Sequence, residues 1–210
     1  MGRKPLDKKR INDPKIRAKW IEHLMPIYMK NGLRQFTMSD ISKELKVSKA
    51  TLYKHFSSRL EILEAVVHLK ISEISAFEEI TMDTNTPYID RYHKAIRNAS
   101  IQLAGISNQF LLDLRELYPE LWEKVQSLQY FAAERAKIFY QEGIELEILN
   151  DFDPAWLAIT DKIFLLGLSD PQFLMDNNLT LQKAVEDYFL MKSKGIFKNY
   201  QGLTSFVEKE

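Results

Sequence analysis

The sequence predicts an all-α protein of about nine helices, with an N-terminal three-helix region followed by a larger helical region. Glycine and proline number only 7 each among 210 residues. Each makes up about 3% of the chain, well below the usual shares of roughly 7% for glycine and 5% for proline. Because both residues interrupt regular structure, long regular elements are expected. Apolar residues recur at steps of three and four residues, as on one face of a helix. No stretch of strict alternation is long enough to predict a strand.

The first element is a helix that begins near Ile16 and ends at Gly32, since glycine is a common C-terminal stop. Pro26 lies inside this helix and is expected to kink it, because proline has no N–H to donate. The apolar stripe of the helix has four-residue steps: Ile16, Trp20, Leu24 and Tyr28.

Two short helices follow. Thr37 is an acceptor cap, and Asp40 is an acidic partner three residues later, a pattern that begins a helix. After a short turn, Ser48 caps a second helix that buries Leu52 and Phe56. Two short helices joined by a turn of three or four residues form a helix-turn-helix, whose second helix enters the DNA major groove.

Longer helices fill the rest of the chain. A helix from about Ser58 to Thr81 would connect the short helices to the larger region. Three later helices open on proline, whose missing N–H has no partner in the first turn in any case. Asp170 and Pro171 interrupt the chain before the last helix. The further helices are expected at 86–103, 118–139, 153–168 and 180–197.

The second short helix has an outer face suited to DNA. Because Leu52 and Phe56 point inward, a rotation of about 100° per residue puts the neighbouring side chains on or beside the opposite face. Lys49 lies at the start of the helix, where positive charge and free N–H groups attract phosphate. The outward-facing or flanking residues are Ala50, Thr51, Tyr53 and Lys54.

Charge is divided unevenly along the chain. Residues 1–70 hold 16 Lys and Arg against 7 Asp and Glu, a formal charge of +9, while the remainder carries −9. A cationic segment on an anionic body is typical of a protein that meets a polyanion at one end.

Several functional classes are excluded or disfavoured. The chain has no cysteine, which excludes disulfides, thiolate metal sites and cysteine nucleophiles and favours a reducing, cytoplasmic location. No apolar run approaches the ~20 residues of a membrane span, and no signal peptide is readable. Enzymatic motifs are not found, so neither catalysis nor a cofactor is expected. The four histidines form no i, i+4 pair, so no metal site is expected: His23, His55, His68 and His93.

Two stretches carry a family resemblance: Gly32-Leu33-Arg34-Gln35-Phe36-Thr37-Met38-Ser39-Asp40-Ile41 and Val47-Ser48-Lys49-Ala50-Thr51-Leu52-Tyr53-Lys54-His55-Phe56. They resemble the DNA-binding signature of TetR/AcrR-type transcriptional regulators, over roughly Ile16 to Val67. Ser42 and Lys46 depart from the pattern, since alanine and glycine are usual at these positions. Pro26 inside the first helix is a third departure.

The resemblance implies a set of DNA contacts. Tyr53 and His55 would grip backbone phosphates, and Arg59 stands where the family usually has a lysine near the DNA backbone. A basic arm at 1–12 would enter the minor groove or remain a solvated tail. The full candidate set is Thr37, Lys49, Ala50, Thr51, Tyr53, Lys54, His55 and Arg59.

The resemblance also implies a helix-turn-helix domain at 13–57, an effector-binding and dimerisation domain at 58–200 and a tail at 201–210. Large aromatic side chains would line an effector cavity or simply fill the core, with Phe110, Tyr118, Trp122, Tyr130 and Phe131 as candidates. The last two helices would form a four-helix bundle with a second copy or contribute to the core. The candidate interface residues are Trp156, Ile163, Phe164, Tyr188, Phe189 and Phe197.

The predicted function is a ligand-responsive transcriptional regulator. It would act as a repressor, bind a palindromic operator of double-stranded DNA as a homodimer and be released by a small apolar or amphipathic effector. The alternative is an architectural or protein-regulated DNA-binding protein without a small-molecule effector, which a body lacking a cavity of roughly 300 Å³ would favour. A helical enzyme is the third class, and a buried titratable cluster in a pocket would support it.

Overall fold

The computed structural model describes residues 13–34, 36–168 and 170–199, so the predicted arm at 1–12 and tail at 201–210 lie outside it. Within these ranges the chain forms eleven α-helices and no strand, with one isolated backbone bridge between Leu149 and Phe197. The all-α prediction is confirmed. The helices are α1 (Pro14–Asn31), α2 (Met38–Glu44), α3 (Lys49–His55), α4 (Arg59–Ser75), α5 (Phe77–Met82), α6 (Tyr88–Leu103), α7 (Asn108–Leu117), α8 (Pro119–Glu145), α9 (Pro154–Gly167), α10 (Pro171–Asp176) and α11 (Leu181–Ile196).

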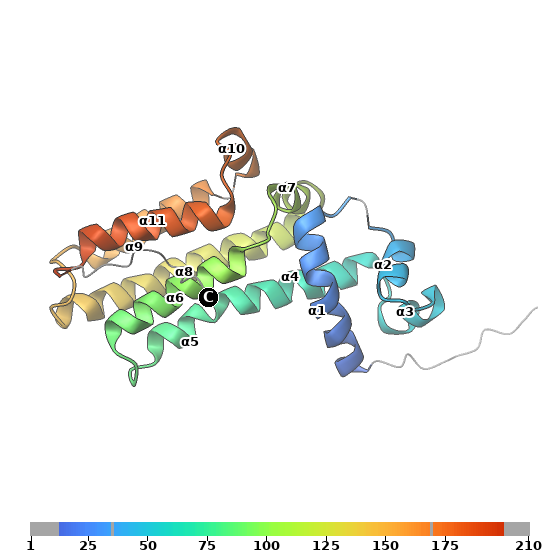
Figure 1. Ribbon diagram of the computed structural model, residues 1–210, viewed down its shortest axis with the longest axis horizontal. Helices are drawn as coiled ribbons and strands as arrows, with labels where there is room; N and C mark the ends of the chain where they lie inside the picture. The colour runs from blue at the N-terminus through green and yellow to red at the C-terminus, as the bar shows by residue number, and fades with distance from the viewer. Residues whose placement is uncertain (1–12, 35, 169, 200–210) are drawn as a thin grey trace, which may run out of the picture.

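The helices form a head, residues 13–57, and a body, which follows it (Figure 1). α1, α2 and α3 make up the head at one end of the molecule, and α6, α8, α9 and α11 run along the body. α4 leaves the head and extends into the body, where it packs against α6 and α8. α1 packs against both α4 and α7. The head therefore meets the body at two places, along α4 and at α7.

The helix expected from about Ser58 to Thr81 is in fact two helices. α4 ends at Ser75 and α5 begins at Phe77, with Ala76 alone between them. The residue at the break is an alanine with right-handed dihedral angles (φ −58°, ψ −16°). Neither a glycine nor a proline therefore marks the break in the sequence. The expected number of about nine helices was too low partly because α5 and α10 have six residues each. Elements this short do not develop a periodic pattern.

The three departures from the family pattern fit into the fold. α1 continues as one helix through Pro26. Ser42 is buried, and its hydroxyl donates a hydrogen bond to the carbonyl oxygen of Ser39 at 2.9 Å. Lys46 has a φ of +55°, in the left-handed region that favours glycine. The turn thus keeps the backbone conformation of a glycine while carrying a lysine.

One hydrophobic core joins the head to the body. Leu24 and Tyr28 of α1 lie in the same cluster of buried side chains as Leu114 and Trp122 of the body. A second core lies away from the head and contains Tyr88, Tyr92, Phe139, Leu157 and Phe197. No helix among the described residues is both long and apolar enough to cross a membrane.

Candidate nucleic-acid interface

The helix-turn-helix is defined by side-chain caps at the start of both helices. The Thr37 hydroxyl accepts the N–H of Asp40 at 3.3 Å, and the Asp40 carboxylate accepts the N–H of Thr37 at 3.1 Å. Hydrogen bonds from Thr37 hold the pKa of Asp40 below its ordinary value. At α3 the Ser48 hydroxyl accepts the N–H of Thr51 at 3.0 Å. Both helices therefore begin where the sequence predicts.

The core beneath α3 fixes which of its faces is exposed. Ile41, Leu52 and Phe56 are fully buried, and Leu45 and Val47 pack against them. The opposite side of α3 reaches solvent, with Lys49, Ala50, Tyr53 and Lys54 exposed and Thr51 half-buried. This cationic outer face, Lys49, Ala50, Thr51, Tyr53 and Lys54, is available to a duplex.

The outer face carries positive charge only, and the hydroxyl of Thr51 on this face is already hydrogen-bonded within the protein. α3 contains two lysines and no acidic residue. The Thr51 hydroxyl lies 2.8 Å from that of Ser48, so it takes part in the helix cap as well as facing outward. Thr37 is exposed, but its hydroxyl is similarly engaged by Asp40 at 2.6 Å. The lysines and Tyr53 are therefore the freest polar groups of the outer face.

His55 does not lie where a phosphate contact was expected. His55 is only 7% exposed, and its imidazole packs edge-on against Trp20 with the ring centroids 4.8 Å apart. Position 55 is three residues after Leu52, which puts the two side chains about 60° apart on the helix. Helical phase alone places His55 on the inner face, whereas the family resemblance suggested a phosphate contact. Its role in this structure is packing.

Arg59 is likewise committed inside the protein. Its guanidinium donates to the carbonyl oxygen of Phe36 at 3.0 Å and to the hydroxyl of Tyr118. It is half-buried and joins the loop between α1 and α2 to the start of α8, so the expected contact with the DNA backbone is corrected to a structural link.

Sequence reasoning missed Arg17 as a support of α3. Its guanidinium donates to the carbonyl oxygen of His55 and pairs with the Glu61 carboxylate at 2.8 Å. It also lies 4.2 Å from the centre of the Phe56 ring. Arg17 therefore holds the end of α3 against the start of α4, and its place one position after the apolar Ile16 gave no sign of this.

Comparisons with known proteins agree with this geometry. The family model described as "Bacterial regulatory proteins, tetR family" matches residues 27–66, from the last turns of α1 into α4. An uncharacterised HTH-type transcriptional regulator of Haemophilus influenzae is 30% identical over 69 residues, which is 33% of this chain and 37% of that protein. Residues 27–66 belong to a TetR-family helix-turn-helix domain. The similarity to bacterial transcriptional regulators is not confined to this domain, since a second relative matches 74% of the chain.

The similarity of this chain to known regulators extends into the body. The HTH-type transcriptional regulator YfiR of Bacillus subtilis is 22% identical over 168 residues, or 74% of this chain and 77% of that protein. A TetR-family transcriptional regulator from Marinobacter aquaeolei has the same fold, with a TM-score of 0.69 at 16% identity. That match covers 88% of this chain and 93% of the other.

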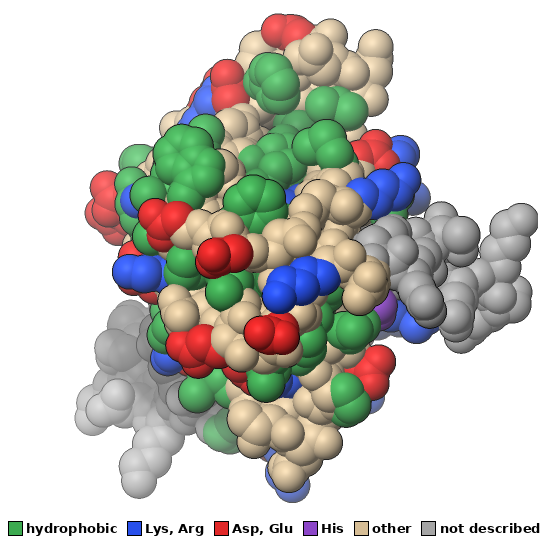
Figure 2. All heavy atoms as spheres, turned by 90° about the vertical axis from the view of Figure 1, so that its left-hand side faces the viewer, with side chains coloured by type: hydrophobic (Ala, Val, Ile, Leu, Met, Phe, Trp, Pro, Cys, Tyr) green, Lys and Arg blue, Asp and Glu red, His purple; other side chains and the backbone are tan. Residues whose placement is uncertain are grey.

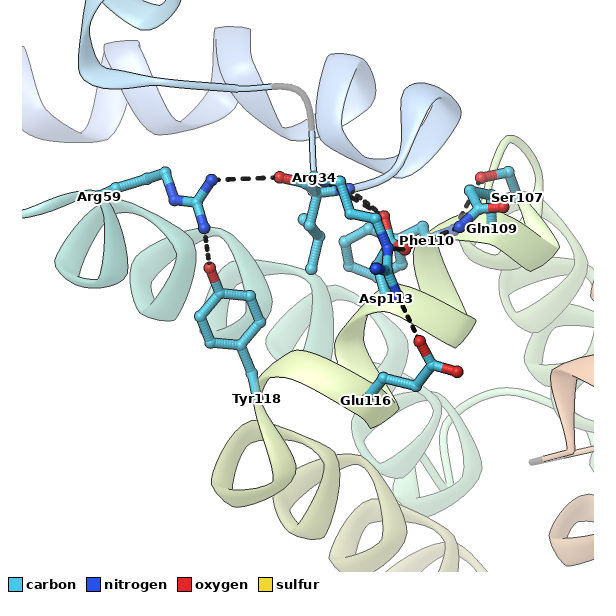
Figure 3. Close-up of polar contacts among 9 residues, drawn as sticks. Arg34, Arg59, Ser107, Gln109, Phe110, Asp113, Glu116 and Tyr118 are labelled. Atoms are coloured by element: carbon cyan, nitrogen blue, oxygen red, sulfur yellow. Dashed lines mark hydrogen bonds and ion pairs between the residues drawn. The ribbon is translucent and has the colours of Figure 1, made fainter.

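A buried carboxylate clasps the head of the protein to its body (Figure 3). Asp113 of α7 accepts the backbone N–H of Leu33 at 2.7 Å and that of Arg34 at 3.3 Å. Its other oxygen pairs with the Arg34 guanidinium at 2.8 Å and accepts from Gln109 at 2.7 Å. Burial alone would raise the pKa of Asp113, but these hydrogen bonds outweigh burial and lower it.

The clasp needs glycine at position 32. Gly32 has a φ of +78°, and a Cβ there would meet the Asp113 carboxylate at 2.7 Å. Beside it, the N–H of Ser107 donates to the carbonyl oxygen of Met29 at 2.9 Å. The end of α1 is thus tied to the start of α7 through Ser107 and to its middle through Asp113.

The body contains a cavity of about 240 Å³. Its lining is almost wholly apolar and comes from α1, α4 to α9 and α11. Opposing small residues, Ala95 and Ala99 of α6 and Ala132 and Ala136 of α8, make room for it. The cavity lies between the second core and the head, since its walls include both Phe139 and Met29.

Only one of the five predicted effector-pocket residues, Phe110, lines this cavity. Tyr118 bonds to Arg59, and Trp122 is buried in the main core. Tyr130 is half exposed under the ammonium of Lys162, and Phe131 packs against Phe77. These four do not line this cavity because they lie on other faces of α8 and its first turn. The aromatic walls are instead Phe77, Tyr92, Phe139, Tyr140 and Phe189.

The predicted dimer residues are divided between surface and interior. Trp156 and Ile163 are 59% and 62% exposed on α9. Phe164 stacks on Tyr188 with ring centroids 3.9 Å apart, so both contribute to packing within the chain. Phe189 lines the cavity, and Phe197 is buried in the second core, which corrects their assignment to an interface.

Three apolar residues that the sequence analysis did not single out are also exposed near Trp156 and Ile163 in the chain or on α11. Ile159 of α9 and Met191 of α11 are 46% and 67% exposed, and Phe152 before α9 is 44% exposed. Figure 2 views the end of the body where α9 begins and α11 ends, and hydrophobic side chains gather in its upper half. The exposed apolar surface of α9 and α11 comprises Phe152, Trp156, Ile159, Ile163 and Met191.

Proposed function

We propose that this chain is a cytoplasmic repressor that binds a palindromic operator as a homodimer and leaves it when a small apolar effector binds. The observation that carries the proposal is the cationic outer face of α3, held outward by a fully buried core and linked to a body that contains a cavity. Lys49, Ala50, Thr51 and Lys54 would meet base edges, and Tyr53 would contact a phosphate.

Two copies are needed because one short helix reads only a few base pairs. A two-fold dimer would place its recognition helices in half-sites roughly 34–36 Å apart or a multiple of that. The exposed apolar surface of α9 and α11 supports this arrangement, since side chains such as Ile163 gain most when a second copy covers them. The interior residues Phe189 and Phe197 are not part of the proposed interface.

A route for effector response runs through α7. One face of α7 lines the cavity with Phe110, Leu111 and Leu114. The other face carries Asp113 and Glu116, which hold the head through Leu33 and Arg34. A molecule that fits the cavity better in one position of α7 or α4 would shift the population towards that position. The spacing of the two heads would change with it, and operator affinity would fall.

The cavity also bears on the two alternatives, a DNA-binding protein without a small-molecule effector and a helical enzyme. Its volume of about 240 Å³ is somewhat below the roughly 300 Å³ typical of ligand pockets, so its apolar lining rather than its size supports an effector. A buried titratable cluster also borders it, formed by Asp161, Tyr140, Tyr188 and Lys192. These groups bond to one another across α8, α9 and α11, which favours a structural role over catalysis.

The test is operator binding by the full chain. Genomic fragments retained by the protein are sequenced, and a duplex with the shared site is titrated at several salt concentrations. We expect two chains per duplex and an affinity that falls steeply from about 50 mM to about 200 mM salt. The double variant Lys49→Ala/Lys54→Ala should lose binding, while the charge-matched control Lys183→Ala/Lys194→Ala on α11 should not. Affinity that is indifferent to both salt and sequence would contradict the proposal.

A further inference from the structure

The cavity in the body is long for its volume. Its lining on α8 runs from Val125 to Tyr140, a distance of about 22 Å at 1.5 Å per residue. On α6 it runs from Tyr92 to Leu103, or about 17 Å. The volume of about 240 Å³ is only about one and a half times the roughly 150 Å³ of a cavity that holds one benzene ring. A space of this volume drawn out along the bundle is a narrow channel.

Polar side chains in the channel wall are already engaged by the protein. The Lys70 ammonium lies 2.6 Å from the Glu73 carboxylate, and the Arg135 guanidinium lies 2.5 Å from that of Glu78. The Thr81 hydroxyl donates to the carbonyl oxygen of Phe77 at 2.9 Å. The Gln129 amide donates to the carbonyl oxygen of Leu165 at 3.1 Å. The two cations in the wall are therefore both paired with acids.

The acidic residue of the wall, Asp161, is also neutralised. Asp161 is 2% exposed, and its carboxylate pairs with the Lys192 ammonium at 2.5 Å. It accepts further hydrogen bonds from the hydroxyls of Tyr140 at 2.6 Å and Tyr188 at 2.8 Å. Lys192 in turn donates to the carbonyl oxygen of Leu157 at 2.8 Å. This set of groups has no net charge to offer a ligand.

A charged ligand would therefore lose its hydration in the channel without gaining a counter-charge, which is costly in an apolar interior. A wide, rigid ligand would have to separate packed helices, and close-packed interiors resist such expansion. A slender uncharged molecule meets neither obstacle, and each of its methylene groups would leave water for an apolar wall.

We propose that the channel takes an uncharged, unbranched aliphatic chain. This inference rests on the effector-responsive function above and names the chemical class of its effector. It makes three separate demands on a ligand: absence of charge, a narrow cross-section, and a length that the channel limits.

The experiment is calorimetric titration of the full chain, without DNA, with straight-chain primary alcohols of increasing length. Affinity should rise about threefold to fourfold per methylene and then level off once the chain fills the channel. At equal carbon number, 1-decanol should bind at least tenfold more tightly than the globular 1-adamantanol. It should also bind at least tenfold more tightly than decanoate or decylammonium.

A variant tests whether the channel is the site. Ala132 lies about midway along the α8 wall, so Ala132→Leu should move the levelling-off to shorter alcohols. The matched control is Ala18→Leu on the exposed surface of α1, which should leave the series unchanged. If Ala132→Leu does not fold, the alcohol series and its charged and globular partners on the unmodified chain still decide the matter.

The outcomes separate this inference from the proposed function. A flat alcohol series, or equal or tighter binding of 1-adamantanol, decanoate or decylammonium, overturns the inference, even if some other molecule releases the operator. If alcohols bind as expected while operator affinity stays the same in their presence, the ligand class stands and the effector response is wrong.

Discussion

The carboxylate of Asp113 accepts the backbone N–H of Leu33 at 2.7 Å, across 80 positions of sequence. This bond crosses from the body to the head, directly beside the glycine that ends α1. The same carboxylate pairs with the side chain of Arg34. A single buried acid thus supplies several of the polar contacts between the DNA-binding motif and the rest of the protein.

Replacement of this acid should be costly. Asp113→Ala would leave the buried N–H of Leu33 without its partner, and we expect the free energy of unfolding to fall by about 2–4 kcal/mol. Glu116→Ala removes the exposed partner of Arg34 and should cost less than about 1 kcal/mol. Urea denaturation of the three proteins measures both effects, and equal losses would show that the clasp is not centred on Asp113.

Acid should weaken the junction between α3 and α4 through Glu61. Burial raises its pKa, but hydrogen bonds from the Ser57 N–H and hydroxyl and from Arg17 outweigh this effect and lower the pKa to about 2. A carboxyl with a lowered pKa in the folded state stabilises the protein above its ordinary pKa of 4.5 and loses this contribution as pH falls towards about 2. The difference in unfolding free energy between the native chain and Glu61→Gln should therefore shrink between pH 6 and pH 3. A constant difference would contradict the assignment.

The turn of the helix-turn-helix contains a removable strain. Lys46 is exposed and has a φ of +55°, which costs a residue with a Cβ about 1–2 kcal/mol. Lys46→Gly should raise the free energy of unfolding by about 0.5–1 kcal/mol once the greater freedom of glycine in the unfolded chain is counted. Lys43→Gly, within α2, is the control and should lower it by about 1 kcal/mol. Thermal denaturation would contradict this prediction if both variants lost stability.

Two residues of the outer face should affect operator binding differently. Lys54→Ala would remove the proposed base-edge contact and should change which sequences are preferred, at a cost of about 1–3 kcal/mol at the affected position. Tyr53→Phe would remove the proposed phosphate contact and should weaken all sites alike. Binding to a panel of single-base operator variants distinguishes the two patterns. The same pattern for both variants would refute these roles.

The dimer surface can be tested with a matched pair of isoleucines. Ile163 on α9 and Ile138 on α8 are each 62% exposed, but only Ile163 belongs to the exposed apolar surface of α9 and α11. Ile163→Glu should convert the proposed dimer to a monomer, because a charge would be buried in the proposed interface. Ile138→Glu should leave the molecular mass unchanged in analytical ultracentrifugation. Dissociation by both variants, or by neither, would place the interface elsewhere.

Local signals predicted much of the fold and of the head. Caps at Thr37 and Ser48, with the apolar pair Leu52 and Phe56, depend on residues a few positions apart and were read correctly. The break at Ala76 has no such local mark, so the periodicity passed over it.

Long-range packing explains what was missed. Which face of α8 lines the cavity depends on helices far away in sequence, and the most conspicuous aromatics, Tyr130 and Phe131, lie on other faces. The small residues at positions 132 and 136 indicate the face of α8 that lines the cavity, because they form part of its apolar stripe and leave space beside it. His55 and Arg59 were misplaced for another reason. Their roles came from the family resemblance, and helical phase already put His55 inside.

The core that unites head and body has an evolutionary consequence. Leu24 and Tyr28 share their neighbours with Leu114 and Trp122, so a chimera made by exchanging heads between relatives would inherit mismatched surfaces on both sides of the junction. New operator preferences are therefore most easily acquired by changes on the solvent side of α3, where substitutions leave the joint interior intact. Changes at cavity positions such as Ala99 and Ala132, which are not among the buried residues of the shared core, would likewise leave that joint intact.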